Sequence, residues 1–161
     1  EPGEMEVTMT VLSCEPKILE MQQFLSEVEV DHLLALAGRR QLHLSTTGKN
    51  EMDGKVQIDS RTSYNTWISR YSSPVVDAIY RRVANVLHID ESLLRHRAKN
   101  ATDRRGSSTL PLSEDLQLVH YEDGQQYTAH HDFSYPDQSV QGHWSPPSRS
   151  INVLIYLNEG M

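Results

Sequence analysis

The sequence has very little cysteine, and this excludes two common ways of stabilising a small domain. Its single cysteine, Cys14, cannot form an internal disulfide and cannot supply a structural zinc site built on several thiolates. No apolar run approaches the roughly 20 residues that a membrane-spanning helix needs, and the acidic segment Glu1–Glu6 has no signal-peptide core. The compartment is therefore left open between the cytoplasm and the endoplasmic reticulum or secretory pathway.

Excess positive charge is lacking as well. The formal net charge is −7 over 161 residues, so nucleic-acid binding is not predicted. One local exception is the segment from Arg81 to Arg105, which contains seven Lys or Arg and only three Asp or Glu. We interpret it as a solvated helix face and loop, with a docking strip for an acidic partner as the alternative. The length and the absence of repeats predict one domain over residues 1–161.

Two segments carry local signals for helices. Ser26 and Glu29 fit a capping box, and apolar residues then follow at helical spacing until Gly38. The pair Ser73-Pro74 predicts the start of a second helix, because proline is favoured at the first helical position.

Alternation of apolar and polar residues, with turn signals between, predicts strands elsewhere. Polar stretches at 45–60, 95–108 and 133–148 are expected to be loops. Helices combined with several short strands predict an α+β fold, in which helices brace a sheet or barrel. The expected strands are Val7–Val11, Lys17–Phe24, Asp115–Tyr121, Tyr127–Phe133 and Arg149–Leu157.

The expected strand Tyr127–Phe133 contains the best candidate for metal chemistry. Side chains two residues apart on a strand share a face, so His130 and Asp132 are expected to project together and His131 to face away. One histidine and one carboxylate make up two-thirds of the 2-His-1-carboxylate triad of non-haem Fe(II) oxygenases. Alone, such a triplet is more often an ordinary surface pair than a metal site.

The surroundings of this triplet resemble the prolyl 4-hydroxylase family. Val119–Asp132 is similar to the family signature Y-x-x-G-Q-x-Y-x-x-H-x-D, Arg61-Thr62-Ser63 to its R-T-S segment, and Arg149–Asn158 to a later strand. The resemblance implies a double-stranded β-helix (jelly-roll) core braced by N-terminal helices. It also implies hydroxylation of peptidyl proline with Fe(II), 2-oxoglutarate and O₂, release of succinate and CO₂, and ascorbate as reductant. The expected partner is a proline-containing peptide or protein.

The resemblance also implies roles for individual residues. His130 and Asp132 would ligate iron. Tyr121 and Asn152 would contact 2-oxoglutarate, although Asn152 stands where several family members have threonine. The residues matching positions of the peptide groove are Arg61, Ser63, Glu114 and Tyr127.

Two expected parts of the family pattern are not found before the sequence ends at Met161. They are a second iron-binding histidine and a nearby Lys or Arg for 2-oxoglutarate; His143, eleven residues after Asp132, is a poor substitute. We therefore expect the C-terminal part of the catalytic domain to be missing. The alternatives are an oxygenase acting on another peptidyl residue or a small molecule, and a non-catalytic binding module. A cupin-type barrel would not explain the Arg61-Thr62-Ser63 segment.

Overall fold

The computed structural model describes residues 7–45, 61–95, 113–132 and 149–158, so most of the three expected loops lie outside it. The chain divides into two compact units. The first consists of Glu1–His43 and Asn65–Val119, and the second of Leu44–Tyr64 and His120–Met161. None of the helices in the described ranges is both long and apolar enough to span a bilayer.

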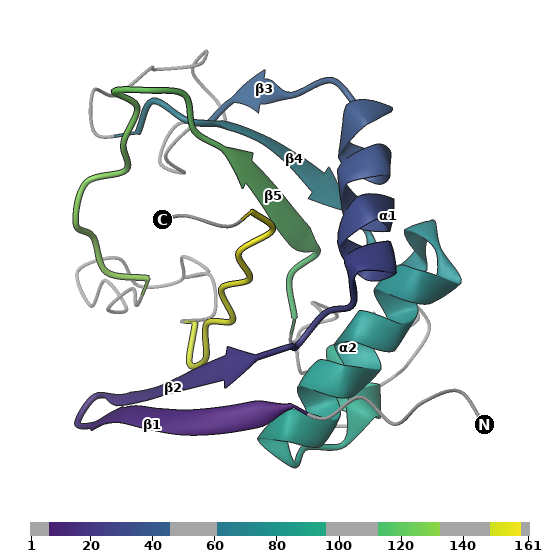
Figure 1. The fold of residues 1–161 in the computed structure, drawn as a ribbon, viewed down its shortest axis with the longest axis vertical. Helices are drawn as coiled ribbons and strands as arrows, with labels where there is room; N and C mark the ends of the chain where they lie inside the picture. Colours follow the sequence, from purple (N-terminus) through teal and green to yellow (C-terminus); the bar gives the residue numbers. More distant parts are fainter. Residues whose placement is uncertain (1–6, 46–60, 96–112, 133–148, 159–161) are drawn as a thin grey trace, which may run out of the picture. The chain divides into compact units, whose positions relative to one another are not determined.

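An antiparallel hairpin opens the first unit. Strands β1 (Thr8–Cys14) and β2 (Lys17–Gln22) form a two-stranded sheet (Figure 1). Thr8 lies opposite Gln22 and Cys14 opposite Lys17, with an irregularity between Val11 and Ser13. Both strands were predicted from their residue patterns, and both are confirmed.

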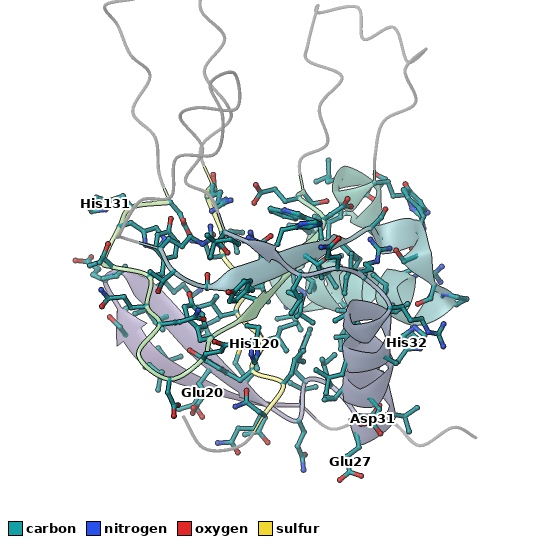
Figure 2. All side chains as sticks on the ribbon, turned by 90° about the horizontal axis from the view of Figure 1, so that it is seen from above. Glu20, Glu27, Asp31, His32, His120 and His131 are labelled. Carbon is teal, nitrogen blue, oxygen red and sulfur yellow. The ribbon has the colours of Figure 1, made fainter. Side chains whose placement is uncertain are left out.

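Helix α1 (Glu27–Gly38) starts and ends where the sequence predicts. The backbone N–H of Ser26 donates to the Glu29 carboxylate at 2.9 Å, and the Glu29 N–H donates to the Ser26 hydroxyl at 3.4 Å. This is the predicted capping box, and it satisfies two N–H groups that the first turn leaves without helical partners. Glu27 and Asp31 extend from α1 into solvent (Figure 2).

Helix α2 (Pro74–Leu87) is also confirmed. Ser73 caps it by accepting a hydrogen bond from the Val76 N–H at 3.2 Å, and Pro74 occupies the first turn. The helix ends at His88, whose φ of 53° is left-handed. The apolar side chains that pack in the core of this unit are Phe24, Leu33, Ala37, Ile68, Val76, Ile79, Tyr80 and Ala84.

Polar contacts join the two helices at two points. Arg82 of α2 donates to both carboxylate oxygens of Glu29 on α1, at 2.7 and 3.0 Å, and to the Phe24 carbonyl at 2.5 Å. Because Arg82 stabilises the charged form, the pKa of Glu29 lies below its ordinary value. His32 of α1 is hydrogen-bonded through Nε2 to the Ser73 hydroxyl at 2.8 Å.

A second set of ion pairs surrounds the start of α2. Arg70, which is 1% exposed, donates to Asp77 at 2.6 Å and also pairs with Glu91. Arg81 and Arg95 pair with the same two carboxylates. Arg81, Arg82 and Arg95, the described arginines of the basic stretch, thus pair with carboxylates of the chain itself. Its two interpretations, a solvated face or a docking strip, stay predictions.

A second sheet has three strands, in the order β3-β4-β5. Its strands are β3 (His43–Leu44), β4 (Tyr64–Ile68) and β5 (Leu116–His120), of which β5 was predicted. Short 3-10 helices, η1 (Arg70–Ser72) and η2 (Glu91–Leu94), flank α2. The mixture of sheets and helices confirms the coarse α and β composition, and the jelly-roll stays a prediction.

Two predicted strands are wrong. Residues 127–132 contain one isolated bridge, at Tyr127, and residues 149–157 form no strand. Alternation shows that one face of a segment is suited to burial, but a strand also needs a neighbouring backbone that bonds to it. Neither segment has such a ladder in the described part of the chain.

Candidate metal centre

A tight turn in the second unit leads into the candidate site. Gly124 has a φ of 80°, a conformation that glycine adopts without strain. The Gln125 N–H donates to the Glu122 carbonyl at 3.0 Å, and the Gln125 side chain accepts from the Glu122 N–H at 2.9 Å. The Gly-Gln pair of the sequence signature therefore builds and closes the predicted turn.

The segment after the turn is held by the Arg61-Thr62-Ser63 segment. Arg61 and Tyr127 form an antiparallel bridge. The Thr62 N–H donates to the Gln126 carbonyl at 3.0 Å, and the Thr62 hydroxyl accepts from the Gln126 N–H at 2.9 Å. Two motifs separated by more than 60 residues in the sequence thus meet directly.

Three side chains form a stacked column here, defined as Arg61, Tyr127 and His130. The Arg61 guanidinium lies over the Tyr127 ring, 4.6 Å from its centroid. The Tyr127 ring stacks on the His130 imidazole with centroids 3.7 Å apart and an interplanar angle of 19°. Such contacts restrict the plane of the imidazole.

A hydrogen bond holds one side of the His130 ring. Its Nδ1 lies 2.8 Å from the Thr128 carbonyl oxygen, which can only accept, so Nδ1 carries the proton. In the neutral imidazole the lone pair is then on Nε2. Metal-binding histidines commonly have their second nitrogen bonded in this way.

The other ring nitrogen of His130, Nε2, lies close to a carboxylate. Asp132 Oδ1 lies 3.4 Å from Nε2, and both side chains are partly exposed. Two ligands at right angles, each about 2.1 Å from a metal ion, would be about 3.0 Å apart. The pair therefore fits two neighbouring ligands of one divalent ion after a small adjustment.

The described residues supply no complete metal site. Across residues 7–45, 61–95, 113–132 and 149–158, no group of three or more His, Cys, Asp and Glu is placed to hold a metal. His143 lies outside these ranges. His131 is exposed, and its side chain extends into solvent (Figure 2).

The other residues expected at the site are placed in different ways. Ser63 is fully buried, and its hydroxyl is hydrogen-bonded to that of Ser45 at 3.0 Å. Tyr121 and Asn152 are exposed in the second unit, and within the described part of the chain neither bonds to His130 or Asp132. Glu114 belongs to the first unit, where its carbonyl accepts a hydrogen bond from the Tyr80 hydroxyl at 2.7 Å.

Sequence reasoning missed Arg149 as a participant in the site. Its Nη1 donates to Asp132 Oδ1 at 2.9 Å, the same oxygen that faces His130. The sequence feature that could have indicated Arg149 is its position at the start of Arg149–Asn158, the segment that resembles a later strand of the family. Its distance of 17 residues from Asp132 gave no indication of contact.

Among known proteins, several prolyl 4-hydroxylases are similar in sequence to this chain. The chain is 29% identical over 150 residues to prolyl 4-hydroxylase 2 of Arabidopsis thaliana, covering 91% of this chain and 42% of the relative. It is 28% identical to the probable prolyl 4-hydroxylase 8 of the same plant, covering 99% and 47%. For the prolyl 4-hydroxylase subunit alpha-1 of Rattus norvegicus, identity is 27% over 76% of this chain and 19% of the relative.

The chain spans about half the length of the plant relatives, or somewhat less. No family model matches it. The chain is thus similar to several prolyl 4-hydroxylases over most of its own length.

Proposed function

We propose that this chain contributes two iron ligands, His130 and Asp132, to an Fe(II)- and 2-oxoglutarate-dependent hydroxylase of peptidyl proline. The observation that carries the proposal is the His130–Asp132 pair, with Nε2 and Oδ1 3.4 Å apart and the Thr128 carbonyl holding Nδ1. The family-level likeness to prolyl 4-hydroxylases supports the reaction type. The family pattern implies a further histidine ligand, and the described residues do not supply it.

The metal centre would supply the oxidising step of the reaction. A bound Fe(II) would supply the oxidative chemistry by which 2-oxoglutarate and O₂ would give succinate and CO₂, with the second oxygen atom becoming the hydroxyl of the proline ring. The residues of this chain bind and orient the reactants. His130 would offer Nε2 to the metal, with Nδ1 held by the Thr128 carbonyl, and Asp132 would offer Oδ1, 3.4 Å from Nε2.

The stacked column suggests how a peptide would lie against the centre. Tyr127 is partly exposed and touches His130, so a side chain packed on its free edge would lie beside the metal. Arg61 is 9% exposed, and we propose that it holds the Tyr127 ring as well as bordering the groove. Glu114 and Ser63 remain proposed groove residues, because of the family positions that they match.

We propose that Tyr121 and Asn152 contact the co-substrate. Both are exposed and carry groups able to hydrogen-bond a carboxylate. This assignment rests on the positions that they match in the family. Ascorbate would act as reductant for the iron, and no residue is assigned to it.

The test is turnover of a proline-rich peptide by the full-length protein that contains this chain, with Fe(II) and 2-oxoglutarate, followed as succinate and hydroxyproline. We expect His130→Ala and Asp132→Asn each to lower succinate formation by at least about 100-fold, because each variant removes one of the two iron ligands that this chain would contribute. The matched control is His131→Ala, which removes the exposed neighbour and should retain turnover within about twofold.

Each outcome decides between stated alternatives. Hydroxyproline with succinate supports the proposal, whereas succinate without peptide hydroxylation favours an oxygenase with another substrate. Retained turnover in either ligand variant would contradict the metal assignment. Absence of Fe(II)-dependent succinate from the wild-type protein would favour the non-catalytic binding module.

A further inference from the structure

Arg149 shares the carboxylate oxygen that the candidate metal centre would use. Its Nη1 donates to Asp132 Oδ1 at 2.9 Å, and this oxygen lies 3.4 Å from His130 Nε2. Both side chains are partly accessible to solvent, Arg149 at 41% and Asp132 at 28%. A small cation can therefore reach the oxygen that already accepts from a guanidinium.

The two cations are too close to be independent. A metal about 2.1 Å from Oδ1 lies no more than about 5 Å from Arg149 Nη1, because Nη1 itself is 2.9 Å from that oxygen. In water at physiological salt, repulsion between charges of +1 and +2 at this distance weakens binding about fivefold. Giving up the exposed ion pair instead would cost a factor of similar size.

We propose that Arg149 is the resident cation of this site. In the metal-free protein its guanidinium neutralises Asp132 and keeps the carboxylate beside His130. A divalent metal must then compete with Arg149 for Oδ1. This inference rests on the proposed metal site. It adds that Arg149 lowers the affinity of that site for a divalent metal ion.

The test is titration of the metal-free protein with Co(II), followed by the visible absorption of the bound ion. We expect Arg149→Gln to bind Co(II) between about two- and tenfold more tightly, since glutamine is neutral but still donates a hydrogen bond. The matched control is Arg149→Lys, which keeps the positive charge and should stay within about twofold of the wild type. Equal or weaker binding by Arg149→Gln would overturn the proposal.

A second measurement follows Arg149 directly. Phenylglyoxal modifies accessible guanidinium groups, and peptide mass spectrometry locates the modified residue. We expect Co(II) to increase modification of Arg149 in the wild-type protein, because the metal takes the carboxylate oxygen. Unchanged or decreased modification at saturating Co(II) would contradict displacement.

The same titration separates the two proposals. Saturable Co(II) binding that is lost in Asp132→Asn, but equal in wild type and Arg149→Gln, overturns the role of Arg149 alone. If the wild-type protein does not bind Co(II) at all, the metal site and the role of Arg149 both fail. Tighter binding by Arg149→Gln supports both.

Discussion

Replacement of Tyr127 by leucine should weaken metal binding even though Tyr127 is not a ligand. The Tyr127 ring lies 3.7 Å from the His130 ring and under the Arg61 guanidinium at 4.6 Å. Leucine has a similar apolar volume, but it has no aromatic face to stack on an imidazole. The change therefore removes the restraint on His130 while leaving both candidate ligands in place.

The size of the effect follows from the two ring contacts. An aromatic pair of this geometry contributes about 0.5–1.5 kcal/mol, and a cation–π contact of a largely buried arginine about 0.5–2 kcal/mol. Only the first contact touches the histidine, so the loss in metal affinity is limited to about 0.5–1.5 kcal/mol, or about two- to twelvefold. The loss of the contact between Arg61 and Tyr127 should instead lower the free energy of unfolding.

The assay is again Co(II) titration, combined with urea unfolding of the metal-free protein. Tyr127→Phe is the matched control, because it keeps the ring, and it should bind Co(II) within about twofold of the wild type. Tyr127→Phe also separates positioning from peptide contact, since a raised peptide KM with unchanged Co(II) affinity would locate the role of the hydroxyl in the groove. Wild-type affinity in Tyr127→Leu, or an equal loss in both variants, would refute the positioning role.

Two further predictions concern the helices of the first unit. Glu29→Gln should lower the free energy of unfolding by about 1–3 kcal/mol near neutral pH, because it breaks the charged pair with Arg82. The pKa of Glu29 is lowered in the folded state. The stabilisation is therefore present above pH 4.5, the ordinary pKa, and is lost as the pH falls through the folded pKa. A difference in unfolding free energy between wild type and Glu29→Gln that does not change with pH in urea titrations would contradict this. Ser73→Ala should cost about 0.5–2 kcal/mol through loss of the cap on Val76, and Ser73→Thr, which keeps the hydroxyl, should retain most of that stability in thermal unfolding.

The helices were predictable because their signals are local. The capping box of Ser26 and Glu29, and the Ser73-Pro74 start, satisfy or avoid unpaired N–H groups within a few residues of themselves. The same is true of the turn at Gly124, whose positive φ selects glycine. For these elements the sequence contains the cause as well as the pattern.

The strands divide according to whether a partner is close in sequence. The hairpin β1–β2 needs only a short turn and was predicted. Segments 127–132 and 149–157 alternate as strands do, yet they have no ladder in the described residues. Periodicity indicates which side of a segment can be buried, but it does not identify the backbone that would bond to it.

By itself the sequence determined the candidate ligands, His130 and Asp132, and their family context. Only the tertiary structure decided how these side chains meet. The sequence predicted that alternation along a strand would place them together. In the structure, His130 is hydrogen-bonded to the Thr128 carbonyl, and Asp132 accepts a hydrogen bond from Arg149. The stacked column and the Arg149 contact join residues from segments distant in the sequence. Contacts of that kind depend on chain folding, which fixes distances that residue spacing leaves undetermined.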